Sequence, residues 1–415
     1  MTDLIIYNIG ELVTSRELDR QENETSLENI EVLKNGYIAV KNGRIYEVGS
    51  GEFPESLRNS HTQVIDAEGK VITPGLVDSH THLVHYGSRE NELALKIKGV
   101  PYLDILKAGG GILSSVRATR AATTEQLIEK ATATLNRMLS FGVTTVESKS
   151  GYGLNLETEI KQLEINKILN ETHPIDVVST FMAAHAIPEE FKGRGEEYVD
   201  EVIRMMPIVK ELDLAEFCDV FCEDAVFTVE NTRKILNKAK EYGFKLKIHA
   251  DEIVFLGGGE LAGELYCISA DHLMAVSDEG IKALKKGGVI ANILPGTSFN
   301  LGKAFAPVKK MLDEGVEVAI SSDYNPGSCP CENLQLAMQI ASSQIKLTPK
   351  EILKAVTING AKAIGKEKVI GSLEKGKKAD FVIFDTKNID YIFYNFGINH
   401  VSEVYKNGES VFKVK

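Results

Sequence analysis

The sequence predicts an α/β protein in which a TIM-like (β/α)8 barrel is joined to a small composite β-sandwich. Two observations predict this fold. Residues 73–365 alternate strand-like apolar runs with amphipathic helical stretches, and eight strand candidates can be counted there. Short β-like runs broken by turns occupy both ends of the chain, so we expect the two ends to pair beside the barrel.

The amino-terminal part is expected to form strands and hairpins. The segments "LIIYNIGELV", "GYIAVKNGRIYEVG" and "TQVIDAEGKVI" are β-like, and the turn pairs Asn42-Gly43 and Glu68-Gly69 indicate hairpins. The carboxyl-terminal "GSLEKGKKADFVIFDT" and "HVSEVYKNGESVFKV" have the same texture. We therefore predict a composite β domain from residues 1–72 plus 366–415, and a catalytic barrel from residues 73–365.

The barrel strands are expected to alternate with helices such as "NLETEIKQLEINKILNE". Active-site residues of such barrels lie just past the carboxyl ends of the strands. The eight strand candidates are residues 71–77, 142–147, 177–184, 217–222, 244–249, 267–271, 288–293 and 316–321.

Composition and charge exclude several classes of protein. The chain has 43% hydrophobic and 26% charged residues, an ordinary globular composition. A formal net charge of −12 without a basic cluster argues against nucleic-acid binding. No uncharged apolar stretch reaches the ~18 residues of a membrane span. The start "MTDLIIYNIGELV" lacks the features of a signal peptide, so we expect a cytoplasmic protein that contacts neither membrane nor nucleic acid.

The five cysteines are expected to be reduced. Cys329 and Cys331 in "GSCPCEN" could bind a soft metal, but a structural zinc site needs a second pair that the sequence does not offer. Packing in a loop is the favoured interpretation, and the same holds for Cys218 and Cys222 in "FCDVFCED".

Five of the nine histidines follow predicted strand ends. His80 and His82 follow the first strand, and residues one apart on a strand point to the same face, about 6 to 7 Å apart. A third imidazole and a carboxylate would complete a site suited to zinc or iron. The polar residues after the later strands are Lys149, Tyr152, His185, His249, Glu252, His272, Asp323 and Asn325.

Several motifs resemble a known superfamily. "PGLVDSHTH", "HADE", "SADHL" and "SSDYNPG" are similar to the amidohydrolase superfamily. The longer stretches "GSRENELALKIKGVPYLDILKAGGGILSSVRATRAAT", "TFMAAHAIPEEFKG", "FCDVFCEDAVFTVE" and "LPGTSFNLGK" resemble, within it, the imidazolonepropionase family over nearly the whole chain.

The resemblance implies roles for individual residues. It implies one divalent metal per chain, Zn²⁺ or Fe²⁺/Fe³⁺, and the strand 217–222 offers no lysine to bridge a second metal. The implied metal ligands are His80, His82, His249 and Asp323. The implied substrate contacts are Arg89, Tyr102, Tyr152, His185, Glu252, Asn325, Gly327 and Ser328. The implied catalytic residues are Glu252, His272 and Asp323, without a decision on which is the general base.

Two positions depart from the family pattern. His85 stands where an aromatic residue is expected, and Cys331 where a small hydroxyl residue is usual. His85 has the wrong strand parity to join His80 and His82, so a packed or solvated loop histidine is favoured. Arg89 could also be an exposed helix-start arginine, and the two tyrosines Tyr102 and Tyr152 could be barrel-rim packing.

The function implied by the resemblance is metal-dependent hydrolysis of a cyclic amide. The reaction would open the ring C–N bond of 4-imidazolone-5-propionate to give N-formimidoyl-L-glutamate, in histidine degradation. The alternative is a deaminase of a small heterocycle on the same scaffold. Arg89 favours the first because it implies a small anionic heterocyclic substrate. A homodimer is the family-level expectation.

Overall fold

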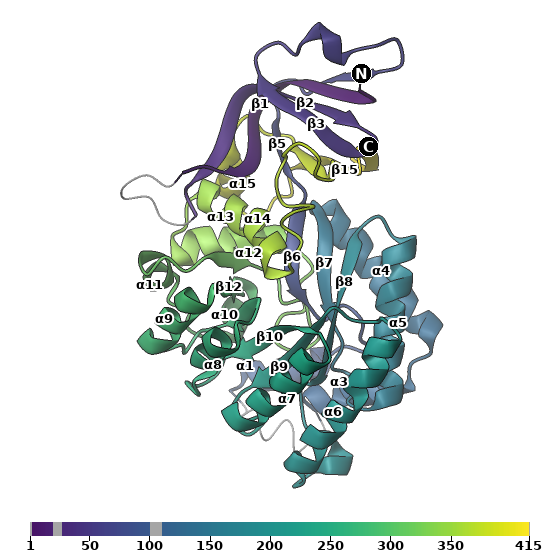
Figure 1. Ribbon diagram of the computed structural model, residues 1–415, viewed down its shortest axis with the longest axis vertical. Helices are drawn as coiled ribbons and strands as arrows, with labels where there is room; N and C mark the ends of the chain where they lie inside the picture. Colours follow the sequence, from purple (N-terminus) through teal and green to yellow (C-terminus); the bar gives the residue numbers. More distant parts are fainter. Residues whose placement is uncertain (1, 20–26, 100–109, 415) are drawn as a thin grey trace.

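The computed structural model describes residues 2–19, 27–99 and 110–414 (Figure 1). It contains two eight-stranded sheets, one closed into a parallel barrel and one made from both ends of the chain. The predicted fold class is confirmed. Figure 1 shows the terminal sheet above the barrel, with both termini in that sheet.

The barrel strands run parallel in chain order. Their residues are nearly all buried, because side chains fill the inside and helices cover the outside. The strands are β6 (Leu76–Thr81), β7 (Val143–Lys149), β8 (Asp176–Ala184), β9 (Phe217–Cys222), β10 (Lys245–Ala250), β11 (Ser269–His272), β12 (Ile290–Ile293) and β13 (Val318–Ile320).

The barrel closes between β6 and the segment that follows β13. The Asp323 N–H donates to the His80 carbonyl at 3.1 Å, and the His82 N–H donates to the Tyr324 carbonyl at 2.8 Å. This closure lies at the carboxyl ends of the strands. It places His80, His82 and Asp323 on neighbouring backbone segments.

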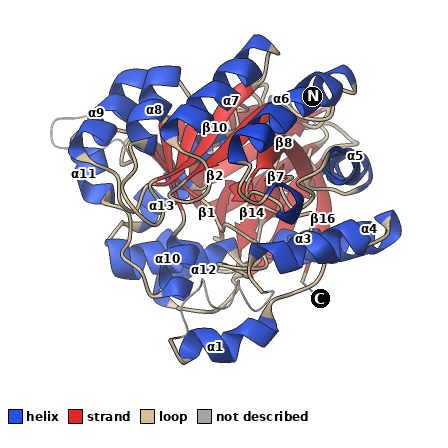
Figure 2. Cartoon of the chain, turned by 90° about the horizontal axis from the view of Figure 1, so that it is seen from below, coloured by secondary structure: helices blue, strands red, loops and turns tan. Residues whose placement is uncertain are grey.

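Helices surround the barrel strands, as Figure 2 shows from below. Helix α4 starts with a capping box in which Thr123 and Gln126 bond each other's backbone N–H groups. The longer helices are α3 (Ile112–Ala121), α4 (Thr124–Ser140), α5 (Leu156–Thr172), α6 (Gly195–Glu211), α7 (Val229–Glu241), α8 (Gly258–Leu265) and α9 (Asp278–Gly287). The shorter ones are α1 (Leu93–Ile97), α10 (Pro295–Leu301), α11 (Val308–Asp313), α12 (Leu334–Ile340), α13 (Pro349–Ala355), α14 (Ile358–Ala363) and α15 (Ile389–Tyr394).

The terminal sheet has the order β16-β15-β14-β5-β1-β2-β3, with β4 also paired to β1. The Asn42-Gly43 hairpin is confirmed: it joins β2 to β3, and both residues have positive φ, 51° and 71°. The strands are β1 (Leu4–Glu17), β2 (Ile30–Lys41), β3 (Arg44–Ser50), β4 (Gln63–Asp66), β5 (Val71–Pro74), β14 (Phe381–Phe384), β15 (Val401–Lys406) and β16 (Glu409–Lys413).

The hairpin predicted at Glu68-Gly69 is wrong. Both residues have positive φ, 56° and 73°, as in a tight turn. However, β4 and β5 on either side of the turn both run parallel to β1 and pair with successive parts of it. The turn therefore shifts the chain along β1 without reversing it.

The single strand predicted over residues 71–77 is also wrong, because the run splits at Gly75. Its first half is β5 of the terminal sheet and its second half belongs to β6 of the barrel. A Cβ at Gly75 would lie 2.1 Å from Thr144 Oγ1, so the chain needs glycine where it passes between the sheets. One continuous apolar run contributes a strand to each sheet because both sheets are buried at this point.

One apolar core extends across the barrel and one side of the terminal sheet, where Val13, Val71 and Phe384 join it. A second cluster, containing Ile6 and Phe381, lies within the terminal sheet. The predicted division between residues 72 and 73 and between 365 and 366 stays a prediction. Among the described residues, no helix is both long and apolar enough to cross a membrane.

Candidate active site

Four buried imidazoles meet at the carboxyl ends of the barrel strands. His80 lies near the end of β6 and His82 just past it, while His249 and His272 lie at the ends of β10 and β11. The ring centroid of His80 is 5.5 Å from that of His82, 4.5 Å from that of His249 and 5.4 Å from that of His272. We call these four residues the imidazole cluster.

Asp323 adds a carboxylate to the imidazole cluster. Its Oδ1 lies 3.4 Å from His80 Nε2 and 4.0 Å from His82 Nε2. Its Oδ2 accepts a hydrogen bond of 2.5 Å from the Thr297 hydroxyl. The φ of Asp323 is 54°, a value that few residues other than glycine adopt and that often marks a functional site.

The donor atoms fit a metal ion. One buried nitrogen of each ring has no hydrogen-bond partner within the described part of the chain: His80 Nε2, His82 Nδ1, His249 Nε2 and His272 Nδ1. An unpaired buried polar atom costs about 1 to 3 kcal/mol, and a cation accepting the lone pairs would remove that cost. Ligand atoms lie within 4.8 Å of one another in two groups, His80–His249–His272 and His80–His82–Asp323.

The predicted ligand set spans both of these groups. His80 belongs to both, His249 to the first, and His82 and Asp323 to the second. His272, which was predicted to be catalytic, is within ligand distance in the first group. The choice of four ligands among these five residues stays a prediction.

Burial keeps the imidazoles neutral. It is the largest cause that lowers the pKa of His80, His82 and His249 well below the usual range. Burial also raises the pKa of Asp323 to about 7. A histidine must be neutral to coordinate a metal, so the cluster is electrostatically prepared to act as a ligand set.

Glu252 lies in the loop after β10 and faces His272. Its Oε2 is 3.5 Å from His272 Nε2. Burial, followed by the charge of Asp323, raises the pKa of Glu252 to about 8, and burial lowers that of His272 to about 4. A carboxyl group with a pKa in this range can both give and take a proton near neutral pH.

His185 and Tyr152 form one wall of the site. The His185 ring stacks on the His82 ring, with centroids 4.7 Å apart and an interplanar angle of 11°. Tyr152 meets His82 and His185 edge-on at 5.7 Å and 5.2 Å. Both side chains are buried beside the imidazole cluster, so the structure brings these predicted residues together with it.

Arg89 and the turn Asn325–Ser328 lie beside each other at the end of the barrel that carries the imidazole cluster, which we call the rim. Asn325 Oδ1 accepts hydrogen bonds of 2.8 Å from the backbone N–H groups of Gly327 and Ser328. A Cβ at Gly327 would lie only 2.2 Å from Arg89 Nη1, so the guanidinium rests against this turn. Glu92 accepts from Arg89 Nη2 at 2.8 Å. Tyr102 lies outside the described residues.

Sequence reasoning missed the carboxylates behind the imidazoles. His80 Nδ1 lies 2.6 Å from Asp271 Oδ2, and His249 Nδ1 lies 3.1 Å from Asp219 Oδ1. Such bonds fix the tautomer that leaves Nε2 available to a metal. The signal available was an acidic residue inside a predicted barrel strand, Asp271 in "SADH" and Asp219 in "FCDVFCED".

The residues that depart from the family pattern stay outside the donor groups. His85 is buried, and its Nδ1 lies 2.7 Å from the His82 carbonyl, consistent with a packed loop histidine. Cys329 is buried, while Cys331 is partly exposed, and all five cysteines are free. No cysteine joins a metal-ligand group within residues 2–19, 27–99 and 110–414.

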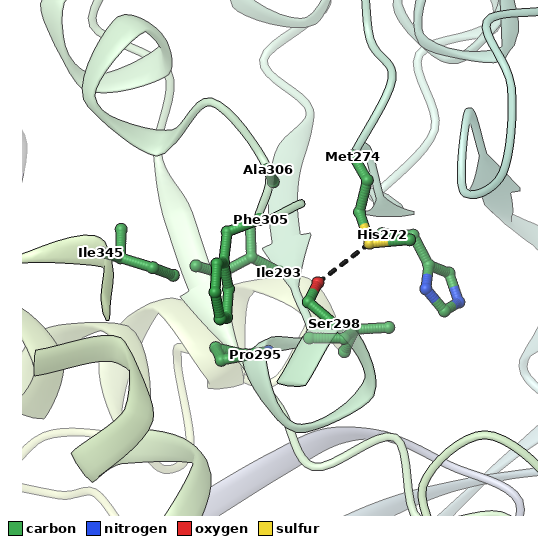
Figure 3. A pocket seen from close by; sticks show the side chains of 9 residues that line it. His272, Met274, Ile293, Pro295, Ser298, Phe305, Ala306 and Ile345 are labelled. Atoms are coloured by element: carbon green, nitrogen blue, oxygen red, sulfur yellow. Dashed lines mark hydrogen bonds between the residues drawn. The ribbon is translucent and has the colours of Figure 1, made fainter. Parts of the chain in front are cut away.

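A narrow crevice, without room for a water molecule, adjoins the imidazole cluster at His272 (Figure 3). Its wall includes His272 and the apolar side chains of Met274, Ile293 and Ile345. The Ser298 hydroxyl donates to Met274 Sδ at 2.9 Å, as the dashed line shows.

Comparison with known proteins places these features in a family. Residues 71–411 match the model of the amidohydrolase family. An imidazolonepropionase from Fusobacterium nucleatum is 60% identical over 99% of both chains. The chain belongs to the amidohydrolase family, among the imidazolonepropionases. A relative of the same name from Alkaliphilus metalliredigens is 56% identical, over 99% of this chain and 98% of the other.

Solved structures share the fold at low identity. An Escherichia coli guanine deaminase superposes with a TM-score of 0.74 at 16% identity, covering 99% of both chains. A 5-methylcytosine deaminase from Klebsiella pneumoniae also gives 0.74 at 16% identity, covering 99% of this chain and 98% of the other. These similarities support the barrel and its accompanying sheet, and carry no information on the substrate.

Proposed function

We propose that this enzyme hydrolyses 4-imidazolone-5-propionate to N-formimidoyl-L-glutamate in histidine degradation. The observation that carries the proposal is a buried guanidinium on the same rim as a neutral imidazole cluster, in a chain 60% identical to an imidazolonepropionase. This combination suits a small heterocycle with an anionic tail.

His80, His82, His249 and Asp323 would hold one divalent metal, with Zn²⁺ or an iron ion as the candidates. When bound, such a metal supplies Lewis-acid polarisation of the ring carbonyl and lowers the pKa of water towards about 7. Imidazole and carboxylate donors suit both metals. The donor set contains no cysteine thiolate, which would have favoured zinc.

The remaining residues of the rim would bind the substrate. Arg89 would pair with the propionate, while Tyr152 and His185 would pack against the ring. The hydrogen-bonded turn of Asn325, Gly327 and Ser328 would present polar groups beside Arg89. For Tyr102, the proposed contact with the substrate rests on the family resemblance alone.

Glu252 would move the proton. Water adds to the ring carbonyl carbon, and Glu252 Oε2 takes the proton that the water loses. Cleavage of the bond between that carbon and the ring nitrogen forms a carboxylic acid, which loses its proton to solvent to give the new carboxylate, and Glu252 returns its own proton to the departing nitrogen. His272 would stabilise the negative charge that develops on the carbonyl oxygen, and Asp323 would share the work of the base.

Product analysis distinguishes this proposal from deamination. Purified enzyme given imidazolonepropionate should consume one water per ring and release N-formimidoylglutamate without ammonia. Arg89→Met should lower kcat/KM about ten- to a hundredfold, which corresponds to a loss of about 1.5 to 3 kcal/mol of transition-state stabilisation, and by less on an imidazolone without the tail. Ammonia release from guanine or cytosine, with no turnover of imidazolonepropionate, would favour the deaminase.

A homodimer and a cytoplasmic location stay predictions.

A further inference from the structure

A buried lysine side chain, to which the proposed chemistry gives no role, lies behind the imidazole cluster. Lys149, the last residue of β7, is fully buried. Its Nζ donates hydrogen bonds of 2.8 Å to Asp219 Oδ2 and to Glu147 Oε1. It also lies 3.6 Å from Asp271 Oδ2.

Two of these three carboxylates hold imidazoles. Asp219 uses Oδ2 for Lys149 and Oδ1 for His249 Nδ1, so it joins the ammonium to the imidazole on β10. Asp271 Oδ2 lies 2.6 Å from His80 Nδ1 and also faces Lys149. One ammonium on β7 therefore stands behind two imidazoles, which come from β6 and β10.

We propose that Lys149 is a positioning residue that holds Asp219 and Asp271 in place behind His249 and His80, so that both rings turn Nε2 towards the metal. This rests on the metal site of the proposed function. Two buried carboxylates that share a site repel each other, and a common cation, hydrogen-bonded to Asp219 and in ion-pair contact with Asp271, offsets that repulsion. The carboxylates in turn accept from the Nδ1–H groups and set the tautomer.

A different role has to be separated from this one. Glu147 lies two residues before Lys149, on the same face of β7, and is fully buried. The Thr180 hydroxyl also donates to its Oε1. If Lys149 only neutralised Glu147, removing both members of the pair would leave metal binding unchanged. If Lys149 positions the two aspartates, removing both would still weaken binding.

The test is the affinity of the full chain for Zn²⁺, measured by competition with a chelator. Lys149→Met should raise the dissociation constant ten- to a hundredfold, the usual effect of losing a group behind a metal ligand. The double variant Lys149→Met/Glu147→Gln keeps the net charge and should bind equally weakly. Glu147→Gln alone should bind within about threefold of the unaltered chain, since Lys149 still holds both aspartates.

Lys354→Met is the matched control. Lys354 is also a buried lysine paired with a carboxylate, 2.7 Å from Glu17, but it lies on α13 away from the histidines. The substitution Lys354→Met should lower the melting temperature of the protein without changing its affinity for Zn²⁺. The visible spectrum of Co²⁺-loaded protein should change in Lys149→Met and not in Lys354→Met, because it reports ligand geometry.

The inference would be overturned if the double variant kept the Zn²⁺ affinity and the Co²⁺ spectrum of the unaltered chain. It would also be overturned if adding Glu147→Gln to Lys149→Met restored the affinity that Lys149→Met had lost. If Lys149→Met alone does not fold, the charge-conserving double variant decides the question. A failure of the unaltered chain to bind Zn²⁺ would instead contradict the proposed metal site, and the inference with it.

Discussion

At the scale of single residues, the site depends on groups whose charge is set by burial. Glu252 and His272 face each other at 3.5 Å, and the pKa of Glu252 is raised to about 8 while that of His272 is lowered to about 4. Neither residue needs a distant partner to explain its shift, because burial is the largest cause for both.

Glu252→Gln tests the proton transfer. The amide keeps the shape of the side chain and removes the base, so kcat should fall by about 10² to 10⁴ while metal content stays unchanged. Elemental analysis and steady-state kinetics measure the two quantities. Glu264→Gln, an exposed glutamate on α8, should leave both unchanged. Normal turnover in Glu252→Gln would reject the proton-transfer role and leave Asp323 or His272 as the base.

His85 predicts an acid-dependent loss of stability. Burial lowers its pKa from 6.5 to about 3, so between these values the unfolded chain binds a proton that the folded chain does not. The free energy of unfolding should then fall by about 1.4 kcal/mol per pH unit below 6.5 because of this group. Urea titrations from pH 8 to pH 5 should show a steeper fall for the unaltered protein than for His85→Phe. Parallel curves would contradict the prediction.

The residues of the site could be predicted where a sequence motif lies at the end of a strand. The buried groups behind the imidazoles could be predicted less well. His80 and His249 lie at strand ends and His82 and Asp323 just past them, and the structure gathers all four in one place. The contact of Lys149 with Asp219 could not be predicted, because it depends on the relative register of β7 and β9 across an intervening strand. A sequence read strand by strand does not contain that register.

At the scale of secondary-structure elements, the seam between β6 and the segment after β13 organises the rim. Its two backbone hydrogen bonds hold His80, His82 and Asp323 in register. The turn that follows carries Gly327 against Arg89. The rim is therefore built by backbone pairing as well as by side chains.

Gly327→Ala should disturb Arg89 without touching the imidazole cluster. The new methyl group would lie 2.2 Å from Arg89 Nη1, so the guanidinium has to move. We expect KM for imidazolonepropionate to rise about tenfold or more, the size of one lost charge-assisted bond, with metal content unchanged. Gly195→Ala is the control, because the nearest atom to the new methyl group there is Ile187 Cδ1 at 3.3 Å. An unchanged KM would show that Arg89 does not read the tail.

The strand pattern of the barrel could be predicted from the sequence, but the connections to the terminal sheet could not. Seven of the eight predicted strands match observed barrel strands within a few residues, because buried parallel strands are continuous apolar runs. The run 71–77 is equally apolar throughout, so its division at Gly75 gives no hydrophobic signal. The turn at Glu68-Gly69 likewise has the residues of a hairpin and another geometry.

At the scale of the whole molecule, the terminal sheet and the barrel share one apolar core. The split at Gly75 makes β6, which carries His80, the direct continuation of β5 in the terminal sheet. Lys378 and Lys406 from the end of the chain also bind Asp176 of β8 at 2.8 Å and 2.7 Å. The terminal sheet thus supports the strands whose far ends form the site.

We propose that one metal, held by His80, His82, His249 and Asp323, makes this chain a hydrolase of imidazolonepropionate. The most direct measurement is the turnover of metal-free enzyme during titration with Zn²⁺ or Fe²⁺, beside the same titration of His249→Ala. Turnover should rise from zero and stop rising at about one equivalent of metal per chain, and His249→Ala should stay inactive. Full turnover by metal-free enzyme, or a plateau reached only at two equivalents, would contradict a hydrolase that depends on one metal.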